Sequence, residues 1–352
     1  MIASVSAALS RSKQALAAYP ELAAVLAAAI VGLSVQRPLA WLADRQGIDV
    51  LLAILVFATA VTIDPVALRR AGAAWRHLLA AVAVGITVLP ALSWAAARLV
   101  APGPLRDGVL TVGLAPCEIA SVATTALAGG EAAVAAGVLI GSTLASVALA
   151  GPILSLEAGT ATGRASLSPA GIIASLALVV ALPLALGLAA RATAGPSASG
   201  TSASGTSAVG TNTAGMTAAA SMAGTGKPVT AFLATARAES IASLTALAAV
   251  AALVALVASE VHLSASYAAV AAALVLFLLA SAVAGRALGT RTTRPARAAL
   301  LLTTSMRDFA IAAGLATAAF SPAAAAPLGL YGIIVLVWGT ATAGFMRRRN
   351  RE

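Results

Sequence analysis

Three charged side chains stand inside two otherwise apolar stretches of this sequence, and they are its best candidates for chemistry. Glu118 lies within residues 106–128, and the adjacent Arg307 and Asp308 lie within residues 297–320. Burying a charge away from water is costly unless a partner compensates it. Two carboxylates against one guanidinium leave a surplus negative charge, which one proton or one bound cation would balance. The pattern predicts an ion or substrate site, and the alternative is an ion pair that only holds helices together.

The polar residues beside these charges suit binding better than catalysis. Hydroxyl side chains flank both groups, and they are Ser121, Thr125, Thr303, Thr304 and Ser305. Ser121 and Thr125 are four residues apart and would share a helix face. Neither histidine lies at the centre of an apolar stretch, and there is no Gly-x-Ser-x-Gly nucleophile motif. The sequence therefore predicts a protein that is not an enzyme, without a cofactor or a metal cluster.

The composition places these residues in a membrane protein. The chain has 352 residues, of which 60% are apolar and 10% charged, with a mean hydropathy of +0.98. Apolar stretches of about 20 residues, the length of a transmembrane helix, recur along it. They do not alternate apolar with polar residues, which favours helices over a barrel. The ten predicted spans are residues 15–35, 48–66, 77–100, 106–128, 131–156, 167–190, 239–261, 264–288, 297–320 and 325–346.

The basic residues predict the orientation of these spans. Most of the 22 Lys and Arg residues fall in loops on one side if the N-terminus, residues 1–14, is cytoplasmic. The basic tail at 347–352 then lies on the same side, and we expect a multi-pass protein of the plasma membrane with no nucleic-acid partner. A cleaved signal peptide within residues 11–33 is the alternative for the first span. Residues 191–237 are predicted to form a flexible cytoplasmic linker, because Ala, Gly, Ser and Thr dominate their centre.

Five helices in each half predict two inverted repeats, residues 15–156 and 167–346. In such folds, interrupted helices at corresponding positions form the binding site, and here these are the fourth and ninth spans. Pro116 gives a direct cause for a break in the fourth span, because proline lacks a backbone donor. The ninth has no Gly or Pro between Thr303 and Ala313, so its break is predicted from the polar cluster alone. The amides freed at each half-helix N-terminus would offer an anion site.

The chain resembles the bile acid:sodium symporter family. Three stretches carry the resemblance: residues 57–64; residues 115–121 with Thr125, Leu127, Ala128 and Gly130; and residues 306–320. It implies a panel of helices 1, 2, 6 and 7 and a core of helices 3, 4, 5, 8, 9 and 10, with the broken fourth and ninth helices crossing in the core. It also implies a secondary transporter that moves a small organic anion across the lipid bilayer by alternating access.

The sodium sites that the resemblance implies look damaged in this sequence. Ser121 is retained, but Val122 stands at the family's asparagine, and Ala135 and Leu139 replace two later hydroxyl ligands. In the ninth span, Thr303 aligns with the family's glutamate and Arg307-Asp308 with its Gln-Asn pair. We therefore hypothesise that Arg307 stands in for a sodium ion, and that any coupling uses protons on Glu118 or Asp308.

Two other functions are considered. The related arsenite permeases resemble the chain in having a cysteine where Cys117 follows Ala115-Pro116, so an arsenite or metalloid exporter that uses Cys117 is the alternative. Their essential glutamate would fall at Ala310, where this chain lacks it. An intramembrane hydrolase or a channel is the alternative from another class, and neither accounts for a broken-helix pair of mixed charge.

Overall fold

Helices make up nearly all of the structure that a computed structural model describes, which comprises residues 24, 27–28, 30–32, 34–44, 46–62, 75–162, 168–193, 229–259 and 266–349. Within these residues, one isolated antiparallel bridge is the only strand-like pairing. Six helices in the same part of the chain are long and apolar enough to cross a membrane. The expectation of an all-helical, multi-pass membrane protein is confirmed at this level, whereas ten spans and an inverted repeat remain predictions.

Most of the helices coincide with predicted spans, but the helix at Gln36–Asp44 lies in none of them. In the first half they are α3 (Gln36–Asp44), α4 (Gly47–Thr62), α6 (Trp75–Ala97), α7 (Pro104–Val112), α8 (Ala120–Leu127) and α9 (Ala132–Thr162). In the second half they are α10 (Pro169–Leu176), the π turn η2 (Ala177–Ala181), α11 (Leu182–Thr193), α13 (Val229–Ser259), α14 (Ser266–Leu288), α15 (Arg294–Ser305), α16 (Phe309–Ala319), the 3₁₀ turn η3 (Pro322–Ala325) and α17 (Ala326–Arg349).

Several predicted boundaries were wrong. The linker does not begin at residue 191 or reach residue 237, because α11 continues to Thr193 and α13 already begins at Val229. Apolar length sets where a span is predicted, but the Ala-rich residues that precede this span are good helix formers and extend α13 beyond it. For the same reason α9 reaches Thr162 and α17 reaches Arg349. Residues 1–14, 194–228 and 350–352 lie outside the described residues, as do most of the first predicted span and the signal-peptide alternative.

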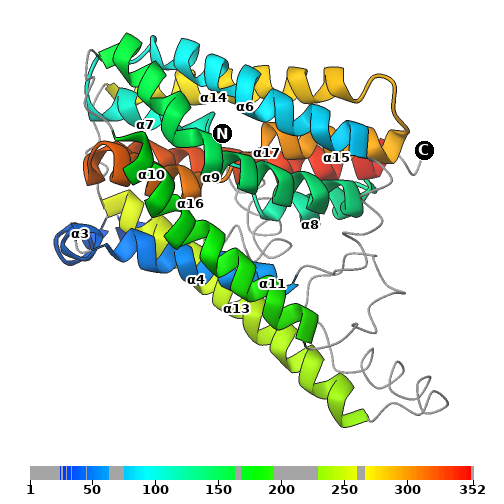
Figure 1. Cartoon of the computed structure of the whole chain (residues 1–352). Coiled ribbons are helices and arrows are strands. Elements are labelled where there is room, and N and C mark those ends of the chain that lie inside the picture. Colours follow the sequence, from blue (N-terminus) through cyan, green and yellow to red (C-terminus); the bar gives the residue numbers. More distant parts are fainter. Residues whose placement is uncertain are drawn as a thin grey trace, which may run out of the picture.

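The helices form two groups (Figure 1). One contains α4, α11 and α13, with α4 packed against both of the others. Gly187 of α11 permits a close approach, since a Cβ built there would lie 2.5 Å from the Cβ of Ala60 and 2.7 Å from the carbonyl oxygen of Phe57. The other group contains α6 to α9 and α14 to α17, and α10 leads from it into the first group. Helices α4, α11 and α13 fall in the second, sixth and seventh predicted spans, which the resemblance assigned to the panel, and the full panel and core arrangement stays a prediction.

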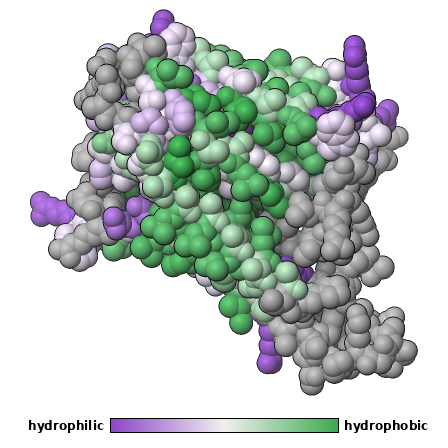
Figure 2. All heavy atoms as spheres, viewed as in Figure 1, coloured by the Kyte–Doolittle hydropathy of each residue, from purple (hydrophilic) through white to green (hydrophobic). Residues whose placement is uncertain are grey.

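The surface has the apolar character that contact with lipid requires. Apolar residues cover the broad middle of the face shown in Figure 2, and hydrophilic residues lie at its margins. Leu156, Val283 and Phe345 are 72%, 68% and 67% exposed, which a soluble protein would avoid across so wide a face. Most of the buried charged and hydroxyl side chains lie instead between the helices of the core group.

Candidate functional site

The fourth predicted span is interrupted around Pro116. Helix α7 ends at Val112 and α8 begins at Ala120, so residues 113–119 lie outside both helices. Proline has no backbone N–H, and its ring crowds the carbonyl four residues earlier, which prevents the helix from continuing. The break therefore has the local cause that the sequence indicated.

The ninth span is interrupted as well, at residues 306–308. Helix α15 ends at Ser305, and Met306 and Asp308 have extended backbones with ψ angles of 106° and 105°. Asp308 then caps α16, because its Oδ1 accepts a hydrogen bond of 2.9 Å from the amide of Ile311. The N-cap accounts for where α16 begins but not for why α15 ends without a proline or glycine.

The two breaks pair with each other, and this pairing supplies the missing reason. Cys117 lies opposite Arg307 in the isolated antiparallel bridge. The amide of Glu118 donates to the carbonyl of Met306 at 2.8 Å, and the amide of Asp308 donates to the carbonyl of Pro116 at 2.9 Å. Each break thus satisfies buried backbone groups that the other has freed, which would otherwise be costly.

Arg307 is the buried cation at the point where the two breaks, residues 113–119 and 306–308, pair with each other, which we call the crossing. Its guanidinium donates a hydrogen bond to the carbonyl of Ala115, a backbone group freed by the first break. Beside it lies Gly85 of α6, where a Cβ would be 3.7 Å from Nη1 and 3.8 Å from Nη2. The arginine therefore makes the contact with a freed carbonyl that a bound cation would make.

Glu118 and Asp308 lie next to the two half-helix N-termini. Glu118 directly precedes Ile119 and Ala120, where α8 begins. Asp308 is the N-cap of α16, and its Oδ1 accepts a hydrogen bond from the amide of Ile311. A carboxylate near a helix N-terminus is favourable, so these two groups would compete with a substrate anion for the same amides. The anion site at the half-helix N-termini stays a prediction.

The five hydroxyl residues divide into two kinds, and all five are buried. Thr303 donates to the carbonyl of Ala299 at 2.8 Å, and Ser305 donates to that of Leu302 at 3.4 Å. The hydroxyls of Ser121, Thr125 and Thr304 have no hydrogen-bond partner among the described residues, and neither do Glu118 Oε2 and Asp308 Oδ2. The unpaired hydroxyls lie in α8 and α15, and the unpaired carboxylate oxygens lie in the two breaks.

The crossing does not fit the sodium ions that the resemblance implies. A hard cation needs several oxygens around it. Here the carbonyls of Ala115, Pro116 and Met306 already have donors, and the Arg307 guanidinium places a fixed positive charge beside the remaining oxygens. Within the described residues, no group of three or more His, Cys, Asp or Glu side chains is arranged to hold a metal ion.

Two aromatic residues of α17 complete the crossing, and sequence reasoning missed their role. Tyr331 is fully buried, and its hydroxyl accepts from the Arg307 amide at 3.3 Å and donates to the Ser305 carbonyl at 3.4 Å. The indole Nε1 of Trp338 donates to the Ser305 hydroxyl at 3.0 Å. Their spacing of seven residues, two helical turns, was the available signal. It did not identify the partner helix.

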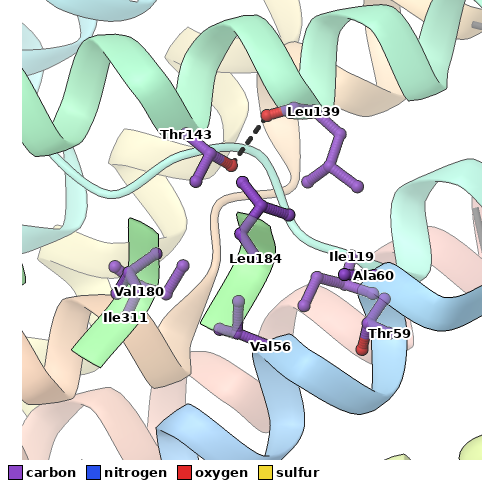
Figure 3. A pocket seen from close by; sticks show the side chains of 9 residues that line it. All are labelled: Val56, Thr59, Ala60, Ile119, Leu139, Thr143, Val180, Leu184 and Ile311. Carbon is purple, nitrogen blue, oxygen red and sulfur yellow. Dashed lines mark hydrogen bonds between the residues drawn. The ribbon is translucent and has the colours of Figure 1, made fainter. Parts of the chain in front are cut away.

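A small cavity lies between the two groups of helices (Figure 3). Its lining comes from both groups, and comprises Val56, Thr59, Ala60, Val180 and Leu184 on one side and Ile119, Leu139, Thr143 and Ile311 on the other. Its two hydroxyls donate to their own helices at 2.7 Å, Thr59 to Leu55 and Thr143 to Leu139. None of the predicted site residues lines this cavity, although Ile119 follows Glu118 directly.

One wall of the cavity is the π turn η2, which has a cause in the sequence. Pro183 cannot donate to the carbonyl of Val179, and the amide of Leu182 instead bonds the carbonyl of Ala177, five residues earlier. The wider turn brings Val180 into the cavity lining. Cys117 is fully buried beside the crossing and does not line the cavity, so the arsenite alternative stays a prediction.

Comparison with known proteins agrees with the resemblance found in the sequence. Residues 49–200 match the family model described as the Sodium Bile acid symporter family. The matched stretch runs from α4 to beyond α11 and includes the break at Pro116, whereas the break at Arg307 lies outside it. No curated protein matches the chain. The resemblance to the bile acid:sodium symporter family is therefore confirmed over this part of the sequence.

Proposed function

We propose that this chain, whose residues 49–200 carry the signature of the sodium bile acid symporter family, is a secondary active transporter of a small organic anion. The observation that carries the proposal is the cavity between the two groups of helices, beside a crossing of two interrupted helices. Binding at such a crossing is the plan of many secondary transporters. The crossing belongs to the core group and the opposite wall to α4 and α11, so movement between the groups would change access to the cavity.

The cavity supports a substrate with an apolar body. Aliphatic side chains supply most of its lining, and its two threonines keep their hydroxyl protons on their own helices. In this structure it is much smaller than a small-molecule site, so a substrate would enter it only when the two groups of helices move apart. The anionic end of the substrate would lie toward the crossing, where Arg307 is the buried cation, because Ile119 joins the cavity to that region.

Coupling would use protons rather than sodium. Glu118 and Asp308 each keep one carboxylate oxygen without a hydrogen-bond partner among the described residues, and that oxygen can hold a proton. Arg307 compensates one of the two carboxylates when both are ionised, so taking up one proton makes the crossing neutral. A neutral crossing is the cheaper one to move through a low-dielectric region. The two inverted repeats proposed from the sequence would supply the rocking motion.

Uptake into proteoliposomes tests this function. The purified chain would be reconstituted and offered cholate and a series of aliphatic carboxylates of increasing chain length, with an imposed proton or sodium gradient. We expect uptake and counterflow of labelled substrate, driven by the proton gradient. Val180→Phe should abolish uptake by filling the cavity, whereas Leu178→Phe, on the same π turn but 64% exposed, should retain it. Uptake driven by sodium alone, or equal uptake in both variants, would contradict the proposal.

A further inference from the structure

One face of α17 is shaped to hold the interruption of the ninth span. Tyr331 and Trp338 lie two turns apart on it, and each is followed by a glycine. A Cβ at Gly332 would lie 3.0 Å from the ring of Phe309, and one at Gly339 would lie 2.7 Å from the Cε of Met306. The glycines therefore leave room for the two side chains that flank Arg307 and Asp308.

The hydrogen bonds of this face reach backbone and side-chain groups that the interruption leaves free. Tyr331 bonds the Arg307 amide and the Ser305 carbonyl, and Trp338 bonds the Ser305 hydroxyl. Ser305 and Arg307 stand on either side of Met306, where the helix stops. With no proline or glycine nearby, a regular helix could otherwise reclaim these groups, so partners from α17 favour the interrupted form.

We propose that Tyr331 and Trp338 are positioning residues that hold Arg307 against Cys117 and keep the crossing of the two interrupted helices closed. Losing either hydrogen bond would let residues 306–308 move away from the first break. Cys117 pairs with Arg307 in the bridge, and its side chain is fully buried while the bridge is formed. Opening of the bridge would therefore make the Cys117 thiol accessible to a reagent. Any consequence for transport rests on the proposed function, but the positioning itself does not depend on transport.

The single cysteine of the chain provides a direct measurement. The full-length protein in detergent would be treated with N-ethylmaleimide, and the rate of labelling at Cys117 measured for wild type, Tyr331→Phe and Trp338→Phe. Tyr331→Phe removes two hydrogen bonds and Trp338→Phe removes one. We expect each variant to label about tenfold faster, which corresponds to about 1.4 kcal/mol in the opening equilibrium and is within the range for loss of buried hydrogen bonds. Thr340→Val is the matched control on α17, since that hydroxyl bonds only its own helix. It should label at the wild-type rate.

A double-variant cycle separates positioning from a general loss of stability. Ser305→Ala and Trp338→Phe remove the two ends of one hydrogen bond, so the double variant should label no faster than the faster single variant. Multiplied rates would show that the two residues act independently and would overturn the proposal. Wild-type labelling rates in Tyr331→Phe, or an equal increase in Thr340→Val, would overturn it too. Size-exclusion chromatography of each variant confirms that the labelled protein is folded, and the outcome is independent of whether the chain transports anything.

Discussion

Replacement of Arg307 by alanine tests the central charge arrangement most directly. The guanidinium is 3% exposed, and it donates to the carbonyl of Ala115. The substitution leaves that carbonyl unpaired and leaves Glu118 and Asp308 without their cation. Leaving a buried hydrogen-bonding group without its partner typically costs about 1–3 kcal/mol, so we expect a loss of about 2 kcal/mol in the free energy of unfolding.

The loss is measurable as a shift in the thermal unfolding temperature of the detergent-solubilised protein. A loss of this size lowers Tm by roughly 3 °C in a chain of 352 residues. Arg98→Ala is the matched control, because Arg98 is exposed and its guanidinium lies over the Trp94 ring, 3.7 Å from the ring centre. Its loss should cost at most about 1 kcal/mol.

Sodium distinguishes a cation substitute from an ordinary buried arginine. If Arg307 takes the place of a bound ion, the alanine variant has the carbonyl of Ala115 and two carboxylates available to a small cation. Sodium at about ten times its dissociation constant would then restore about 1.4 kcal/mol, or roughly 2 °C in Tm. Exchanging sodium chloride for choline chloride should change Tm in Arg307→Ala and not in wild type. If the two salts give the variant the same Tm, the idea that arginine replaces an ion is refuted.

Two further substitutions test the panel helices. Gly187→Ala should lower Tm, because the new Cβ meets Ala60 and the carbonyl of Phe57 and overpacking costs about 1–3 kcal/mol. The control Gly344→Ala has open space around it and should leave Tm unchanged or slightly raised. Equal Tm values for the two variants would contradict the close approach of α4 and α11. Pro183→Ala should restore a backbone donor to the Val179 carbonyl, favour a regular helical turn over η2 and rotate Val180 out of the cavity. We therefore expect substrate uptake to fall several-fold without a fall in Tm. Unchanged uptake would show that the π turn has no role in substrate binding.

Local signals in the sequence predicted most of the helices. Apolar runs of membrane-spanning length gave the positions of α6, α9, α14 and α17, because each helix satisfies its own backbone and needs no distant partner. Pro116 gave the first break for the same reason, since its missing donor acts within one turn. Helix ends were predicted less well, as α13 shows, because helix propensity continues where hydrophobicity ends.

The candidate site was predicted only in part. The two interruptions of the fourth and ninth spans do pair with each other, and Asp308 caps one of the half-helix N-termini where the sequence placed a substrate anion. The residues that line the cavity were not predicted. Val56, Leu139, Val180 and Ile311 look like ordinary apolar residues in their own helices, and only the packing of four distant segments makes them the lining of one cavity.

The sequence by itself determined that the chain forms apolar helices, that the fourth span breaks at Pro116, and that three charged residues stand inside apolar spans. Only the tertiary structure decided that the ninth span breaks at Met306, that Arg307 pairs with the carbonyl of Ala115, and that Tyr331 holds the interruption. The difference is physical. A helix or a proline break is settled by groups within one or two turns, whereas an interruption without proline or glycine is stable only when groups far away in the sequence satisfy the backbone that it frees.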